Sequence, residues 1–155
     1  MIKNYKLIIS AWVLIASGIV SAQEQNLDAE ALEVRQFIER LATHMEAGDL
    51  MSVGEMYSPE RGVHIIEGAG VNHGWEEYRD DHLEPELQAF QNLEYRYFAI
   101  EPQVRGNIAY AAFRYELSAD TEDSQIDIEG RGTIILEKIE GQWKIVHIHT
   151  SGRPR

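Results

Sequence analysis

Residues 130–154 are G-R-G-T-I-I-L-E-K-I-E-G-Q-W-K-I-V-H-I-H-T-S-G-R-P, and they decide the fold of this chain. The segment Glu140-Gly141-Gln142 predicts a tight turn between two long strands. Because side chains alternate along a strand, residues at odd positions of the second strand share one face. We expect this face to form the floor of a pocket, with two histidines beyond two large apolar side chains: Trp143, Ile145, His147, His149 and Ser151.

The opposite face of this strand predicts an interface. Val146 and Ile148 have the other parity and fall, with Lys144 and Thr150, on the outer side of the sheet. An apolar outer face on a small domain is typical of a buried contact between two copies of a chain. We therefore expect a homodimer formed through the sheet.

Three further strands are predicted before this one, over residues 93–101, 108–117 and 126–139. The first is expected to stop at Pro102, which cannot donate a ladder hydrogen bond. Gly130 and Gly132 indicate a bend or bulge where the sheet curls.

The N-terminal half carries helical patterns. From Leu32 onward, apolar residues recur at helical spacing between Asp28, a suitable N-cap, and Gly48, a suitable stop. A shorter helix follows Asp49, which is again a suitable cap. A short strand over residues 63–67 comes next.

A third helix is predicted over residues 73–90. Pro85 cannot donate to the carbonyl of Asp81, so this helix should kink or break near His82. His82 and Glu86 are four residues apart and share one face if the helix continues through the bend.

This order of elements defines the fold class. Three helices in the N-terminal half, followed by antiparallel strands, predict an α+β fold in which a curved sheet wraps around the helices. The result is a cone with a pocket.

The first 22 residues are typical of a secretory signal peptide. A short basic region precedes an apolar run over residues 7–20, and Val20-Ser21-Ala22 supplies small residues for cleavage. We expect a mature domain of residues 23–155 that is periplasmic or secreted. The alternative is an uncleaved N-terminal anchor.

Composition excludes several classes of partner and site. The chain has 26 acidic and 14 basic side chains among 155 residues, a formal net charge of −12. Such a surface repels phosphate backbones and anionic lipids, so neither nucleic acid nor, after signal removal, a membrane is an expected partner. The absence of cysteine from the sequence excludes disulfides and thiolate metal ligands.

Element order and two local motifs resemble a known superfamily. The third helix starts with Gly74-Trp75, and the segment from Gly141 to Ser151 has the form G-x-W-K-I-V-H-x-H-x-S. These features resemble the SnoaL-like branch of the nuclear transport factor 2-like superfamily. The resemblance implies a cystatin-like cone whose cavity opens at one end, often in a homodimer. That superfamily includes isomerases, cyclases, dehydratases, hydrolases and binding domains without catalytic activity, so the fold does not fix the function.

The last strand is also similar to the exported iota-type carbonic anhydrases, which end in W-x-I-V-x-H-H-S-S-x-x-P. Matching residues are Trp143, Ile145, Val146, His149, Ser151 and Pro154. Ile148 stands where that family has its first histidine, and Thr150 replaces the first serine. Because a polar residue of the signature is missing, we expect little carbon dioxide hydration.

The histidines suggest that the cavity binds a metal ion. Parity directs His147 and His149 into the cavity, where His82 and Glu86 of the kinked helix face them. Three imidazoles and a carboxylate suit a divalent ion such as zinc or copper. The whole expected ligand pocket is Trp75, Tyr78, His82, Glu86, Arg114, Trp143, His147 and His149.

Other interpretations of these residues stay open. The histidines can be neutral pocket walls, or His149 or His82 can act as a general base. In the catalytic case Ser151, Thr150, Tyr78 or Arg114 would orient a small substrate. The predicted function is binding of a small ligand or a divalent metal. One alternative is an enzyme of isomerase, hydratase or carbonic-anhydrase-like lyase type, and another is a protein-interaction module.

Overall fold

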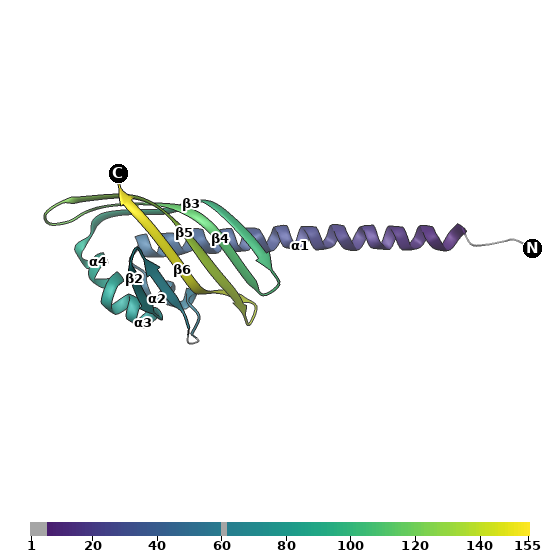
Figure 1. The fold of residues 1–155 in the computed structure, drawn as a ribbon, viewed down its shortest axis with the longest axis horizontal. Coiled ribbons are helices and arrows are strands. Elements are labelled where there is room, and N and C mark those ends of the chain that lie inside the picture. The colour runs from purple at the N-terminus through teal and green to yellow at the C-terminus, as the bar shows by residue number, and fades with distance from the viewer. Residues whose placement is uncertain (1–5, 60–61) are drawn as a thin grey trace, which may run out of the picture.

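The computed structural model describes residues 6–59 and 62–155, with side chains from residue 25 onward. The first half of the chain holds the helical elements and two short strands, and four long strands fill the second half (Figure 1). The helical elements are α1 (Lys6–Glu46), α2 (Leu50–Met56), α3 (Trp75–Tyr78), the π-helical turn η1 (Arg79–Leu83) and α4 (Glu84–Ala89). The strands are β1 (His64–Glu67), β2 (Gly70–His73), β3 (Gln91–Arg105), β4 (Ile108–Asp120), β5 (Gln125–Ile139) and β6 (Gln142–Pro154).

The six strands form one sheet in the order β2-β1-β6-β5-β4-β3. Neighbouring strands are antiparallel except β1 and β6, which run parallel. The sheet is curved and open, and the helices lie on one side of it (Figure 1). The predicted α+β cone is therefore confirmed.

Helix α1 fills the concave side of the sheet. Val34, Ile38 and Leu41 of this helix are completely buried, as their spacing predicts. Two details of the prediction are wrong. The helix starts at Lys6, so Asp28 lies inside it and is not an N-cap, and Leu32 is 53% exposed because it lies on the helix face turned from the sheet.

The predicted signal peptide, residues 1–22, lies outside the residues whose side chains are described. In the part of the chain with described side chains, no helix is long and apolar enough to cross a membrane.

The predicted cap of the second helix is confirmed. The backbone N–H of Ser52 donates to Asp49 Oδ1 at 3.1 Å, which satisfies one free donor at the start of α2.

The third helix is interrupted at the predicted place. Residues Arg79–Leu83 form a π-helical turn in which the backbone N–H of Glu84 donates to the carbonyl of Arg79. Pro85 lies next, at the start of α4, where its missing N–H costs least. Strand β2 was not predicted; it forms a hairpin with β1 and shortens the third helix, which begins at Trp75 instead of residue 73.

Two predictions about the strands are wrong. Pro102 does not end β3, because β3 is the edge strand and a proline there costs no inner ladder bond. Gly130 and Gly132 do not lie at a break in register. They make room for aromatic rings instead: a Cβ atom at Gly132 would lie 2.3 Å from Phe113 Cζ, and one at Gly130 would lie 2.2 Å from Tyr115 Cε1.

The register break in the last hairpin lies within β6. Leu136 pairs with Ile145 and Ile135 pairs with His147, so Val146 is an extra residue that forms a β-bulge. A single inserted residue reverses the parity of every side chain after it. Because of this bulge, the side chains of β6 beyond Val146 point to the opposite side of the sheet from the one that strict alternation predicts.

Trp143 and Ile145, before the bulge, are buried as predicted. After the bulge, Ile148 and Thr150 are buried at 5% exposure each, whereas His149 and Ser151 are exposed. His147 and His149 therefore point to the outer face of the sheet, and the expected apolar patch of Val146 and Ile148 is absent there.

Candidate functional site

A cavity of about 200 Å³ lies between the helices and the concave face of the sheet. Most of its wall is apolar, and a few polar side chains converge on it, which is the usual composition of a small-molecule pocket. The apolar lining is Met45, Leu83, Leu87, Phe90, Leu93, Leu117, Ile126 and Ile128. The polar side chains are Glu67, Tyr78, Glu86, Tyr95, Tyr115 and Thr150.

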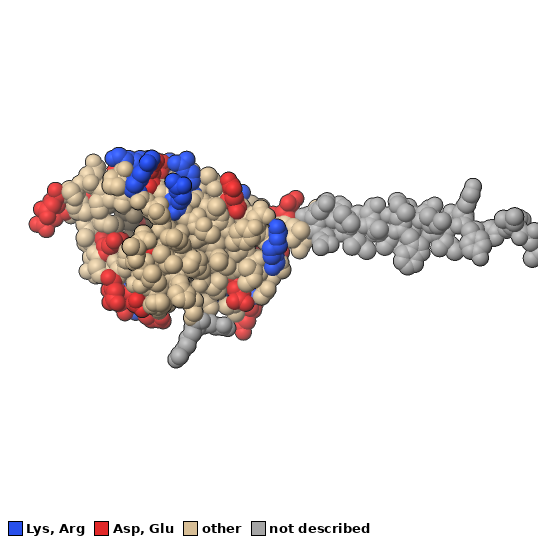
Figure 2. Space-filling model, viewed as in Figure 1, with Lys and Arg blue, Asp and Glu red and all other residues tan. Residues whose placement is uncertain are grey.

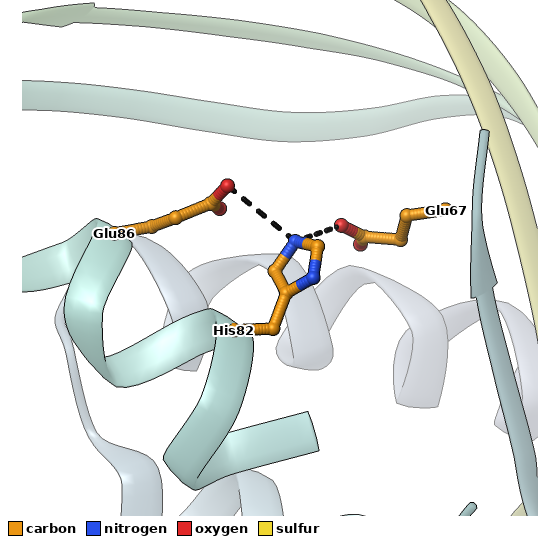
Figure 3. Close-up of side chains that lie close together, drawn as sticks. All are labelled: Glu67, His82 and Glu86. Atoms are coloured by element: carbon orange, nitrogen blue, oxygen red, sulfur yellow. Dashed lines mark ion pairs between the residues drawn. The ribbon is translucent and has the colours of Figure 1, made fainter. Parts of the chain in front are cut away.

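Glu67, His82 and Glu86 form an acid–base cluster at this cavity (Figure 3). Nε2 of His82 lies 2.8 Å from Oε2 of Glu67 and 3.4 Å from Oε1 of Glu86. The two carboxylates approach the imidazole from opposite sides, one from the end of β1 and one from α4 (Figure 3). The kink in the helix places His82 between them, and the hydroxyl of Tyr78 donates to the other oxygen of Glu67 at 3.0 Å.

The cluster shifts two ionisation equilibria. The hydrogen bond to Glu67 raises the pKa of His82, aided by the negative charges of Glu67 and Glu86 and opposed by burial. Burial raises the pKa of Glu86, while the charge of His82 opposes that shift. Both shifts favour the protonated form, so the cluster holds protons at the cavity wall more firmly than free side chains do.

Tyrosines extend the polar wall of the cavity. The hydroxyl oxygens of Tyr95 and Tyr97 lie 2.9 Å apart, and Tyr97 donates to Sδ of Met45 at 3.9 Å. Tyr97 has one hydrogen, so Tyr95 is the donor of the pair and its oxygen keeps acceptor capacity. Burial raises the pKa values of Tyr78 and Tyr95 well above the ordinary range, which keeps both phenols neutral.

The structure brings together only part of the predicted pocket. Tyr78 and Glu86 line the cavity, and His82 joins Glu86 as the helix spacing predicts. His147 and His149, on the outer face, are separated from His82 by the sheet, so the predicted four-residue metal site is not formed. Ser151 shares that outer face.

Three other predicted pocket residues lie elsewhere. Trp75 stacks on Tyr57 with ring centroids 5.2 Å apart, beside a separate surface depression. Trp143 lies under Lys138, whose Nζ is 5.0 Å from its ring centre, and lines a depression against α1. Arg114 points outward over Phe98, 5.4 Å from that ring, because its position in β4 has outward parity.

Sequence reasoning did not place Glu67 and Tyr115 in the cavity, and it named Thr150 only as a residue that could orient a substrate. Glu67 ends the short strand directly before the Gly68-Ala69-Gly70 turn, where a charged residue in an apolar strand was a usable signal. Thr150 became a cavity residue only through the bulge at Val146.

The arrangement supports three kinds of chemistry. The carboxylate of Glu67, fixed by Tyr78 and His82, can accept a hydrogen bond from a ligand in the cavity. His82 and Glu86 can give or take a proton. Ligand atoms of all three cluster residues lie within 4.8 Å of one another, a spacing that a divalent cation can bridge.

Comparison with known proteins agrees with the cone. A protein of the nuclear transport factor 2-like (NTF2-like) superfamily from Salmonella enterica serovar Typhimurium superposes with a TM-score of 0.73 at 22% identity, over 83% of this chain and 94% of that one. A candidate dehydratase of the NTF2-like family from Streptomyces avermitilis gives 0.68 at 13% identity, over 84% and 99%. An NTF2-like protein with a cystatin-like fold from Novosphingobium aromaticivorans gives 0.66 at 12% identity, over 87% and 88%.

At these identities the likeness shows the fold alone. No curated protein matches the sequence. Residues 34–154 match the profile of the SnoaL-like domain, which covers most of the chain. The chain therefore belongs to the SnoaL-like domain family.

Proposed function

We propose that this protein binds a small, mostly apolar molecule that is neutral or cationic and carries a hydrogen-bond donor. The observation that carries the proposal is Glu67, a carboxylate fixed by Tyr78 and His82 in the wall of a mostly apolar cavity. The partly shielded carboxylate of Glu67 disfavours an anionic ligand, because two negative charges would share a site of low polarity. The oxygen of Tyr95 adds a second acceptor for the same class of ligand.

Four probes with six-membered rings test this choice: phenol, cyclohexylamine, cyclohexanone and benzoate. Each is titrated into the isotope-labelled chain and followed by NMR shifts of the cavity residues. We expect phenol or cyclohexylamine to bind about tenfold more tightly than benzoate, and this preference to disappear in Glu67→Gln. Equal affinity for benzoate, or shifts only outside the cavity, would contradict the proposal.

An enzyme of isomerase or hydratase type is the second candidate. The convergence of Glu67, His82 and Glu86 favours it, and burial shifts the pKa of the Glu86 carboxyl upward, in the direction that suits a group that gives and takes protons. Exchange of the α-hydrogens of cyclohexanone in heavy water measures this activity directly. In Glu67→Gln the exchange rate should fall to the rate in buffer alone. If the unmodified protein exchanges these hydrogens no faster than buffer does, this class of substrate is excluded.

A divalent metal ion at the acid–base cluster is a further proposal, supported by the convergence of Glu67, His82 and Glu86. In this case a zinc or copper ion replaces the proton that the three side chains share. Calorimetric titration should then show one site that Glu86→Gln weakens, and an unchanged affinity would reject it.

Export and self-association belong to the same proposal. The pattern of residues 1–22 supports a periplasmic or secreted protein, which mass measurement of the mature N-terminus tests. The family fold supports a homodimer, which sedimentation of the purified protein tests.

A further inference from the structure

Four of the six histidines of the chain lie at one end of the outer face of the sheet: His64, His73, His147 and His149. They come from three neighbouring strands, β2, β1 and β6. His64 is the register partner of His73 on one side and of His147 on the other. Three imidazoles therefore form a row across three strands, and His149 is two residues further along β6.

The direction of this row is fixed by its neighbours. Ile65 and Ile148 are register partners and are buried at 1% and 5% exposure, so they point into the core. Side chains one position earlier on the same strands must point outward, which places His64 and His147 on the outer face. The His64 and His73 rings meet edge to face with centroids 5.1 Å apart.

In the described part of the chain, none of these four rings has an acidic partner. Among the residues with described side chains, the ion pairs of histidine involve only His44 and His82. Imidazoles that serve only to hold the fold together are normally buried and hydrogen-bonded. His64, His73 and His149 are instead exposed and His147 is half-buried, so dissolved ions can reach all of them.

The spacing suits one metal ion. Side chains that face each other across adjacent strands start about 4.5–5.5 Å apart, which is within reach of imidazoles that converge on one ion at about 2.0–2.1 Å. Within the described residues only the cavity cluster already has its ligand atoms within 4.8 Å of one another. The imidazoles of His64, His73 and His147 therefore converge on an ion when their side chains rotate, which is rapid and costs little free energy.

We propose that His64, His73 and His147 bind one late divalent transition-metal ion, zinc, copper or nickel, on the outer face of the sheet, with His149 beside them. Imidazole nitrogen is the ligand that these ions share, and the net charge of −12 draws cations toward the surface. Such an ion would link the edge strand β2 to β1 and β6. This site is separate from the proposed ligand cavity and does not depend on it.

Calorimetric titration of zinc chloride and copper chloride into the untagged chain tests this proposal. It is done in a Glu67→Gln background, which removes one ligand of the cavity cluster. We expect one ion per chain, with a raised melting temperature because the ion binds only the folded sheet. His64→Gln or His147→Gln should weaken binding roughly tenfold or more and abolish the rise in melting temperature.

His44→Gln is the matched control, because His44 is a partly exposed histidine on α1 that should not contribute. Circular dichroism confirms that each variant folds. NMR of the imidazole rings should show zinc-dependent shifts for His64, His73 and His147, and none for His44. The proposal is overturned if neither ion binds in the Glu67→Gln background, or if His44→Gln weakens binding as much as His64→Gln does.

Discussion

The imidazole of His82 lies 2.8 Å from the carboxylate of Glu67 and joins the π-helical turn to the end of β1. Both side chains are about three-quarters shielded from solvent, at 27% and 29% exposure. This contact brings together two elements that are distant in the sequence and sets the polar end of the cavity. Its consequences for stability and binding can be measured.

The first prediction concerns stability and pH. The pKa of His82 is raised above its ordinary value of 6.5 in the folded protein. The contribution of His82 to stability is thus fully present below pH 6.5 and is lost as the pH rises through the raised value. Urea unfolding should show His82→Gln to be less stable than the unmodified protein by ~1 kcal/mol at about pH 5.5, with little difference at about pH 9. A difference that stays constant with pH would contradict this interpretation.

The second prediction concerns Glu86. Burial raises the pKa of this carboxyl group, so its ionisation opposes folding and stability falls as the pH rises through the raised value. Glu86→Gln removes that ionisation and should be more stable than the unmodified protein above neutral pH, at the expense of ligand binding. Thermal unfolding at about pH 8 measures the effect. Glu84→Gln, on the same helix, is the control and should change stability by less than about 0.5 kcal/mol. A loss of stability in Glu86→Gln would mean that its contact with His82 outweighs the cost of burial.

Tyr78→Phe gives the third prediction. Tyr78 is 2% exposed and its hydroxyl donates to Glu67, so the variant leaves one carboxylate oxygen without this partner. We expect a loss of about 1–2 kcal/mol in unfolding free energy and weaker selection of hydrogen-bond donors by the cavity. Tyr110→Phe is the matched control, because Tyr110 is 44% exposed on the outer face. Equal losses in the two variants would show that the Tyr78 hydroxyl has no special role.

Sequence reasoning located the parts of the site that depend on local geometry. The pairing of His82 with Glu86 follows from helical spacing, and the bend between α3 and α4 follows from Pro85. Glu67 could not be placed in the same way, because its approach to His82 depends on how β1 packs beside the kinked helix. Tertiary packing of this kind leaves no periodic signal along the chain.

The prediction of which side chains of the last strand point into the cavity failed for a different reason. Strict alternation from Trp143 puts His147 and His149 inside, but the bulge at Val146 puts Ile148 and Thr150 there instead. Burying an isoleucine contributes about 1.5–3 kcal/mol, and leaving two imidazoles in water avoids their desolvation. The sequence held a usable signal here. A strand with one bulge buries Ile148 and also leaves the neighbouring histidines in water, whereas strict alternation buries the histidines and exposes Ile148.

The fourth prediction tests that reversed parity. Ile148→Ala should lower the unfolding free energy by about 2–5 kcal/mol, since Ile148 is 5% exposed and packs in the core. His149→Ala should change it by no more than about 0.5 kcal/mol, because its side chain is exposed. Urea unfolding in the presence of a metal chelator makes this comparison free of bound ions. If His149→Ala lowered the unfolding free energy more than Ile148→Ala did, the side chains of β6 would alternate without a bulge and this interpretation would be wrong.

The last prediction concerns the space beneath the aromatic rings of the cone. A Cβ atom at Gly132 would lie 2.3 Å from Phe113 Cζ, so Gly132→Ala should cost about 1–3 kcal/mol through overpacking. Gly70→Ala is the control, because its nearest neighbour would be 3.4 Å away. Adding Phe113→Leu to Gly132→Ala should recover part of the loss, and a double-mutant cycle measures this coupling. Strictly additive losses would show that Gly132 is required for the backbone of β5 and not for the ring of Phe113.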